Sequence, residues 1–236
     1  MISLELHKVN LTYPILGSSS KSLRSRIVKN LTGGIISSKN NNDIIHVNAL
    51  QNINIKLNEG DKIGLVGHNG SGKTSMLRLM AGILEPTTGK VTRNGKISCL
   101  INPSAGLNPE ATGLENIFLR SYLLGMKENE IKNKIDQIIE FADLGKFIDL
   151  PMRTYSSGMV SRLSYSISTA IEPDILLIDE GIGAGDANFT KKIKINTLEF
   201  LKKSKIVVFA SHNLSFLKEI GAKIIKLEKG QIIKNK

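Results

Sequence analysis

The stretch Gly67-His68-Asn69-Gly70-Ser71-Gly72-Lys73-Thr74 decides the fold of this chain. It matches the pattern G-x-x-x-x-G-K-[ST], a loop whose glycines let backbone N–H groups approach phosphate oxygens without a Cβ in the way. The apolar run 62–66 before the loop indicates a buried strand, and the apolar residues at 76, 77, 80 and 81 recur at helical spacing. This strand–loop–helix order predicts a nucleoside triphosphate site, because the helix start adds the positive end of its dipole.

Two side chains of this loop have expected chemical roles. Lys73 is expected to reach the β- and γ-phosphates, and the Thr74 hydroxyl is expected to hold Mg²⁺. A glycine-rich turn with an exposed lysine is the plain alternative, and the strand and helix around the loop argue against it. The loop residues expected to contact the nucleotide are Gly67, His68, Asn69, Gly70, Ser71, Gly72, Lys73, Thr74 and Ser75.

Composition limits the remaining possibilities. The chain has 236 residues, 41% of them hydrophobic, which suffices for one large α/β domain. The formal net charge of +11 favours an anionic partner, namely a nucleotide, nucleic acid, anionic lipid or acidic protein face, without choosing among them. The single Cys99 cannot form an internal disulfide, which indicates a reducing compartment, and we expect it to be a small core residue. No apolar run approaches the ~20 residues that span a bilayer, so a role at a membrane requires spanning helices from another chain.

The first 48 residues predict one strand followed by an unusual insertion. Residues 2–13 alternate like a strand, and Pro14 is expected to end its pairing because it lacks an N–H donor. Residues 15–48 are rich in Ser, Asn, Gly and Lys. A basic amphipathic helix near 21–29 that contacts a membrane surface or membrane subunit is one interpretation; a solvated, partly disordered insertion is the other.

The rest of the chain alternates strands and helices. A turn at Asn94-Gly95 predicts a hairpin between 90–92 and 97–101. Lys229-Gly230 predicts a second, closing hairpin. The expected strands are 49–57, 175–178 and 206–210, and the expected helices are 113–124, 128–144, 157–171 and one around 189–201.

The apolar strand Ile175-Leu176-Leu177-Ile178 delivers two carboxylates at its tip. Asp179 is placed to hold Mg²⁺, directly or through water. Glu180 points elsewhere and is expected to accept a proton from an attacking water as the general base. Two solvated acids at an ordinary strand end are the alternative, which the phosphate loop makes less attractive.

A second anion-binding feature precedes the helix at 157–171. The run Tyr155-Ser156-Ser157-Gly158-Met159 places small hydroxyl residues at a helix start, where they normally cap the helix. The same arrangement presents amides and hydroxyls to an anion, so one helix start can serve both purposes.

The order of these motifs, ending in Ser211-His212 after another strand, resembles an ATP-binding cassette (ABC) ATPase along nearly the whole chain. The resemblance implies an α/β fold with a RecA-like parallel-sheet core, an N-terminal antiparallel β subdomain and an inserted α-helical subdomain at about 103–172. It implies one nucleotide-binding domain over 1–236, without a C-terminal carbohydrate-binding domain. ATP and Mg²⁺ are the implied cofactors.

A narrower resemblance is to the exporters of O-antigen, capsular and teichoic-acid polysaccharides. It is carried by Tyr155–Met159, by Asn108-Pro109-Glu110-Ala111-Thr112-Gly113-Leu114-Glu115-Asn116 and by Gly185-Asp186-Ala187-Asn188-Phe189. It implies an ATP-hydrolysing subunit that exports a lipid-linked polysaccharide from the cytoplasmic face of the inner membrane, held there by two copies of a polytopic permease, with no nucleic acid. The alternatives are an ABC transporter for a lipid or drug, and a soluble ABC ATPase acting on ribosomes or DNA.

The resemblance also implies a head-to-tail homodimer with two ATP molecules between the cassettes. Ser156, Ser157, Gly158 and Met159 would contact the ATP of the opposite protomer, and Asp186 would lie in a dimer-contact loop. Ser157 and Met159 depart from the usual Leu-Ser-Gly-Gly-Gln pattern, as they do in the polysaccharide exporters.

Three further positions follow from the same resemblance. His212 matches a histidine that senses the γ-phosphate and positions Glu180. Tyr13 would place its ring on adenine, or else pack on the core as a strand-end tyrosine. Asn102 falls near a glutamine that reaches Mg²⁺ and couples to the membrane subunit, or else is a plain loop asparagine. The region 102–126, together with the segment near 21–29, is the expected contact with the permease.

Overall fold

The computed structural model describes residues 1–15, 36–38, 45–101, 104–179 and 187–233. It confirms an α/β fold, with an antiparallel N-terminal sheet and parallel strand pairing. The chain divides into two compact units, the first formed by residues 1–95 and 208–236 and the second by residues 96–207.

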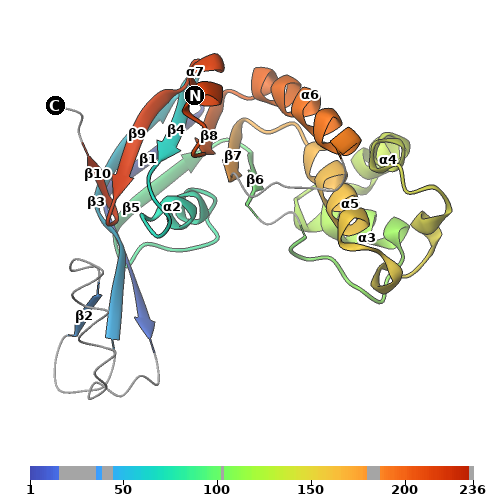
Figure 1. Cartoon of the computed structure of the whole chain (residues 1–236), viewed down its shortest axis with the longest axis horizontal. Helices are drawn as coiled ribbons and strands as arrows, with labels where there is room; N and C mark the ends of the chain where they lie inside the picture. The colour runs from blue at the N-terminus through green and yellow to red at the C-terminus, as the bar shows by residue number, and fades with distance from the viewer. Residues whose placement is uncertain (16–35, 39–44, 102–103, 180–186, 234–236) are drawn as a thin grey trace. The chain divides into compact units, whose positions relative to one another are not determined.

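An antiparallel sheet in the order β2-β3-β1-β5 forms one layer of the first unit (Figure 1). Its strands are β1 (Ser3–Ile15), β2 (Ile36–Ser38), β3 (Ile45–Asn58) and β5 (Thr88–Asn94). Leu4 pairs with Leu57 and Leu6 with Ile55, and these four side chains are buried. Alternate apolar residues of both strands therefore build one face of the core.

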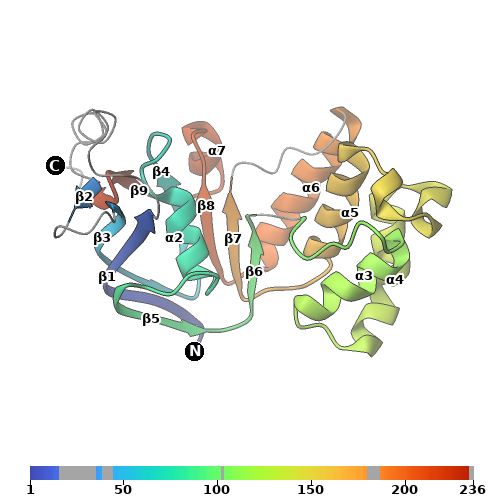
Figure 2. The same cartoon turned by 90° about the horizontal axis from the view of Figure 1, so that it is seen from below.

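The phosphate loop lies between elements of this first unit. Strand β4 (Lys62–Val66) pairs in parallel with β9 (Lys223–Glu228), which forms the predicted hairpin with β10 (Gln231–Ile233). On its other side β4 neighbours β8 (Ile206–Ala210). Helix α2 (Lys73–Met80) buries four apolar side chains and packs on β3 and β5 (Figure 2), while the short α7 (Leu214–Glu219) packs on β9.

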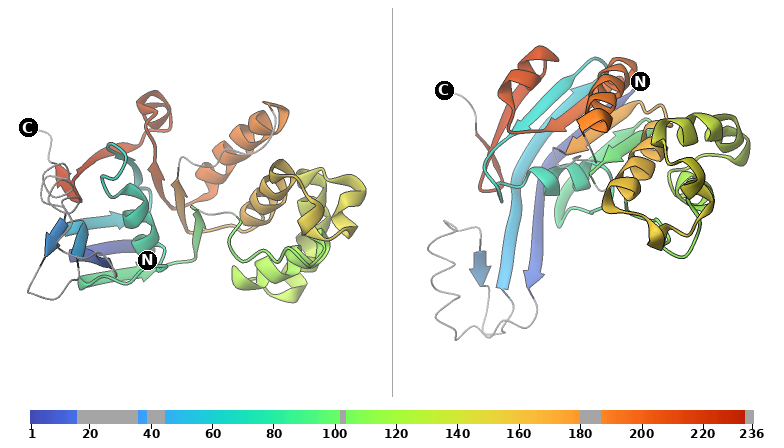
Figure 3. Two further views of the ribbon diagram at one scale, coloured as in Figure 1. Left: turned by 60° about the horizontal axis from the view of Figure 1, so that its bottom comes forward. Right: turned by 45° about the vertical axis from the view of Figure 1, so that its right-hand side comes forward.

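The second unit is mostly helical. Strands β6 (Ile97–Leu100) and β7 (Ile175–Asp179) pair in parallel. Figure 3 shows α3 (Gly113–Leu123), α4 (Glu128–Ala142) and α5 (Ser157–Thr169) gathered into one bundle. The core of this bundle includes the buried side chains of Ile117, Ile131 and Leu163. Two 3₁₀ turns, η1 (Gly145–Asp149) and η2 (Met152–Thr154), precede α5, and α6 (Ala187–Lys203) follows β7.

Three local expectations are wrong. Pro14 does not end the first strand, because Pro14 pairs with His46 and Ile15 with Ile45. Asn94-Gly95 does not turn a hairpin: β5 pairs with β1, whereas β6 pairs with β7. Cys99 is partly exposed rather than buried in the core. The basic segment near 21–29 lies outside the described residues.

The helices in the described part of the chain lack the combination of length and apolar character that crossing a bilayer requires.

Candidate nucleotide-binding site

Tight backbone geometry shapes the phosphate loop. It leaves β4, whose middle residues are buried, and enters α2 through Gly72, which is left-handed with φ of 107°. A Cβ on Gly72 would lie 2.8 Å from the Ala49 carbonyl oxygen, so glycine is required on both conformational and steric grounds. The first turn of an α-helix has N–H groups without partners inside the helix, and here that turn opens directly from the loop.

The buried hydroxyl of Ser71 indicates whether the loop fits an anion. Its side chain is 1% exposed, and its Oγ has no hydrogen-bond partner among the described residues. A buried hydroxyl without a partner is costly, and a phosphate oxygen would satisfy it. The residues of the loop therefore fit the phosphate groups of a nucleotide.

The closing hairpin of the chain supports the loop from outside. Gly230 donates its backbone N–H to the Ser71 carbonyl at 3.0 Å and accepts from the Gln51 N–H at 2.8 Å. A Cβ on Gly230, where φ is 76°, would lie 2.6 Å from the Ala49 carbonyl oxygen. Sequence reasoning identified the turn but not this contact, because nothing in a Lys-Gly turn indicates a partner about 160 residues earlier.

Lys73 and His212 meet in the first unit. The Lys73 Nζ donates to the Gly67 and His68 carbonyl oxygens at 2.6 and 3.2 Å, and it lies 3.3 Å from the His212 Nε2. His212 is positioned by its neighbours: the Ser211 N–H bonds to the Leu65 carbonyl of β4, and Asn213 caps α7. The structure therefore brings together two residues that are far apart in the sequence.

Tyr13 lies beside the start of α2. Its hydroxyl is 3.5 Å from the Ser75 Oγ, at the outer limit of a hydrogen bond, and its side chain is half-buried. Its predicted contact with adenine stays a prediction. The exposed His68 is turned onto its own loop, with Nδ1 2.7 Å from the Asn69 carbonyl oxygen.

The serine-rich helix start lies in the second unit. Ser156 caps α5, since its Oγ accepts from the Met159 N–H at 3.2 Å. Ser156 and Ser157 are exposed, while Gly158 and Met159 are half-buried. These residues adjoin a cavity of about 540 Å³, whose lining is Asp143, Leu144, Phe147, Ser156, Gly158, Met159 and Arg162.

The predicted metal and catalytic residues are described only in part. Asp179 is the last residue of β7 and is half-buried. Asn102, Glu180 and Asp186 lie outside the described residues, so their roles stay predictions.

This combination of a phosphate loop after a buried strand, a lysine beside a histidine and a serine-capped helix is that of an ABC ATPase. The family model described as ABC transporter matches residues 50–183, and the chain belongs to this family. The chain has the cassette fold throughout: it superposes on the dimeric ATP-binding cassette MJ0796 bound to ADP and Pi with a TM-score of 0.70, 22% identity and coverage of 99% of this chain and 97% of that one.

Curated relatives are similar along almost the whole chain. The O-antigen export system ATP-binding protein RfbE of Yersinia enterocolitica is 44% identical over 232 residues, which cover 98% of this chain and 97% of RfbE. The teichoic acids export ATP-binding protein TagH of Staphylococcus haemolyticus is 38% identical over 231 residues, which cover 98% of this chain and 83% of TagH.

Proposed function

We propose that this chain is the ATP-hydrolysing subunit of an ABC transporter that exports a lipid-linked polysaccharide across the cytoplasmic membrane. The observation that carries the proposal is the similarity to the O-antigen export protein RfbE, which runs from end to end of both chains. The relatives named for O-antigen and teichoic-acid export share the transport of a cell-surface glycan, and this supports a glycan as the cargo.

In this proposal, the phosphate loop holds the ATP and Lys73 neutralises its terminal phosphates. Thr74 and Asp179 are the residues that would hold Mg²⁺, which when bound would offset charge on the phosphate oxygens. Glu180 removes a proton from the attacking water, and His212 positions that water against the γ-phosphate. Ser156–Met159 of a second cassette complete each site, so hydrolysis requires a dimer.

ATP performs mechanical work because it binds the closed dimer more tightly than the open one. Closure moves two permease subunits, which hold the cassettes at the cytoplasmic face of the membrane. Hydrolysis removes the γ-phosphate contact and allows the dimer to reopen.

The exposed apolar side of α3 supports the region 102–126 as the contact with the permease. Leu119, Tyr122 and Leu123 are 43, 48 and 70% exposed. Beside them is a cavity of about 570 Å³, and its lining is Asn108, Glu110, Ala111, Glu115, Phe118 and Leu119. Apolar side chains gathered in this way favour a protein partner.

The test of the catalytic assignment is Glu180→Gln. This variant should bind ATP and Mg²⁺, accumulate as a closed dimer, and hydrolyse ATP on the order of 10²-fold more slowly or worse. Glu140→Gln, at an exposed position of α4, is the matched control and should hydrolyse normally. Undiminished hydrolysis by Glu180→Gln would show that the base is another residue.

The test of the cargo is export in cells. The cassette and its permease should restore surface polysaccharide to a strain lacking its own cassette, and Glu180→Gln should not. Restored transport of a lipid or drug without any surface glycan would replace the proposed cargo.

A further inference from the structure

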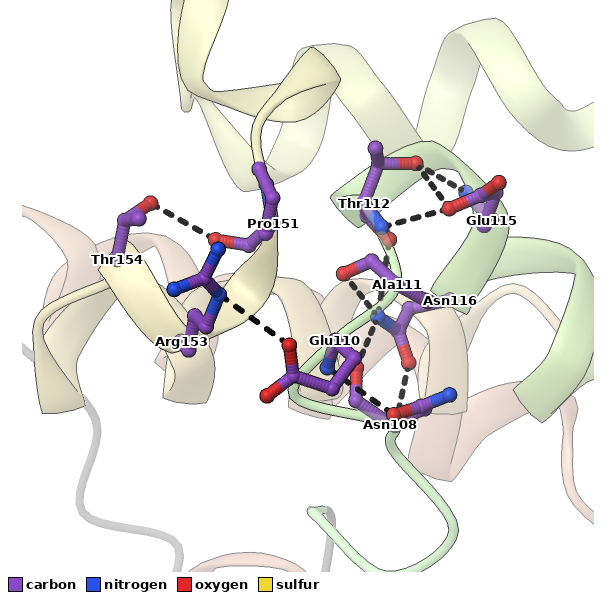
Figure 4. Close-up of polar contacts among 9 residues, drawn as sticks. All are labelled: Asn108, Glu110, Ala111, Thr112, Glu115, Asn116, Pro151, Arg153 and Thr154. Atoms are coloured by element: carbon purple, nitrogen blue, oxygen red, sulfur yellow. Dashed lines mark hydrogen bonds and ion pairs between the residues drawn. The ribbon is translucent and has the colours of Figure 1, made fainter.

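The segment that leads into the serine-capped helix is attached to the loop before α3. The Met152 N–H donates to the Ala111 carbonyl at 2.9 Å, and the Arg153 N–H donates to the Pro109 carbonyl at 2.8 Å. An ion pair of 3.3 Å joins Arg153 to Glu110 (Figure 4). Because both charged side chains are largely exposed, the backbone bonds contribute more to this attachment than the ion pair.

The buried side chain of Asn116 holds the 108–112 loop rigidly against the start of α3. Asn116 is fully buried, and its Oδ1 accepts from the Asn108 N–H at 2.7 Å. Its Nδ2 donates to the carbonyls of Asn108 and Thr112, both at 2.9 Å (Figure 4). Thr112 and Glu115 close a capping box at the same helix start. A force applied to the loop is therefore passed to the first turn of α3.

Tyr155 joins the first turn of α3 to the helix start at Ser156–Met159, which we call the serine motif. Its hydroxyl donates to the Phe147 carbonyl at 2.5 Å and lies directly against Gly113, the first residue of α3. A Cβ on Gly113 would lie 2.2 Å from the tyrosine oxygen, so only glycine leaves room for this contact.

The ring of Tyr155 is held as well as its hydroxyl. It meets the Phe147 ring edge to face, with centroids 6.5 Å apart and an interplanar angle of 87°. Burial raises the pKa of the Tyr155 hydroxyl, against the opposing effect of the nearby Gly113 backbone, so the group stays protonated and able to donate at neutral pH. The next residue in the chain is Ser156, the cap of α5.

We infer that Tyr155 is a positioning residue that transmits displacement of the 108–113 loop to Ser156–Met159. The inference rests on the proposed function, in which the region 102–126 contacts the permease and the serine motif contacts ATP of the opposite cassette. A permease movement that displaces the start of α3 also displaces Tyr155. Because Tyr155 directly precedes Ser156 in the chain, Ser156 moves with it.

The experiment compares ATP hydrolysis by cassettes with and without the reconstituted permease. Tyr155→Phe keeps the ring and removes the hydroxyl, with its hydrogen bond to Phe147 and its contact with Gly113. It should lower the stimulation by the permease about five- to tenfold, which is the effect expected from the loss of one hydrogen bond. The KM for ATP should change less than about twofold, because the phosphate loop is untouched. Glu140→Gln, at an exposed position of α4 away from the proposed permease contact, is the control and should be stimulated normally.

Gly113→Ala is the second variant, since its methyl group would push the tyrosine hydroxyl away. It should lose stimulation as Tyr155→Phe does, and the double variant should lose less than the product of the two effects. Normal stimulation of a folded Tyr155→Phe protein would overturn the inference, as would unfolding of both variants. A wild-type cassette that is not stimulated at all would instead refute the proposed permease contact, and with it this inference.

Discussion

The Nζ of Lys73 lies 3.3 Å from the Nε2 of His212, a residue 139 positions further along the chain. A lysine ammonium can only donate, so this contact requires an unprotonated Nε2 and the proton of the neutral imidazole on Nδ1. The same ammonium also donates to the carbonyls of Gly67 and His68. Its three donors are thereby engaged, and a nucleotide phosphate that binds Lys73 must replace at least one of these contacts.

We predict that His212→Ala separates binding from hydrolysis. Loss of a positioned imidazole should lower kcat on the order of 10²-fold, whereas the affinity for ATP should stay within a few-fold because the phosphate loop is intact. Steady-state hydrolysis and a nucleotide-binding titration measure the two quantities. The control is His7→Ala, at an exposed position of β1. Equal loss of binding and hydrolysis would mean that His212 mainly shapes the loop.

A second prediction concerns the glycine of the closing hairpin. Gly230→Ala should lower the free energy of unfolding by about 1–3 kcal/mol and weaken ATP binding, because its methyl group would displace the Ala49 carbonyl beside the phosphate loop. Gly221→Ala is a close control: its φ of 70° resembles the 76° of Gly230, but a Cβ there meets nothing within 4 Å. Urea unfolding and nucleotide titration provide the comparison. Equal effects in the two variants would attribute the loss to backbone strain alone.

Most of the fold could be predicted from the sequence because its signals are local. The helices α3, α4 and α5 begin at the residues that apolar spacing predicts, and Ser156 caps α5 as expected. The prediction of a hairpin at Asn94-Gly95 was wrong for a physical reason. A turn dipeptide shows that the chain bends, but it does not show which strands the flanking segments pair with. The prediction that Pro14 ends the first strand was also wrong, because a missing N–H ends strand pairing only where the partner strand requires that donor.

The features of the candidate site also divide into those that a local sequence motif predicts and those that only the structure shows. Lys73, Thr74 and the loop glycines are contiguous, so a motif finds them. The support from Gly230 and the contact of Tyr155 with Gly113 depend on residues distant in the sequence, and neither residue type nor spacing indicates them. Such contacts require a structure.

The buried asparagine of α3 gives a third prediction. Asn116→Ala should destabilise the second unit by about 2–3 kcal/mol, because it leaves the Asn108 N–H without its partner and removes a buried side-chain donor to the carbonyls of Asn108 and Thr112. The 108–112 loop should also become more sensitive to proteolysis. Asn133→Ala, on the exposed side of α4, should change stability by less than about 0.5 kcal/mol. A stable variant with an unchanged digestion pattern would show that the backbone contacts to 152–153 suffice.

The last prediction concerns alkaline pH and the buried Tyr165. Burial raises the pKa of Tyr165 to about 12, despite the hydrogen bond with Thr197 that lowers it. An unfolded tyrosine has a pKa near 10, so above that pH the unfolded state loses its proton first. The stability that this group contributes is therefore complete below about pH 10 and is lost as the pH rises towards 12; the loss is about 1 kcal/mol by pH 11.

Tyr165→Phe isolates this contribution. The variant should be less stable than the wild type at pH 8, since Thr197 loses a partner 2.9 Å away, and the difference should shrink by about 1 kcal/mol between pH 8 and pH 11. Urea unfolding at each pH measures the difference, in which other titrating groups cancel. A difference between wild type and Tyr165→Phe that stayed constant with pH would mean that the hydroxyl titrates alike in the folded and unfolded chains, and that the contact between α5 and α6 opens to solvent around Tyr165.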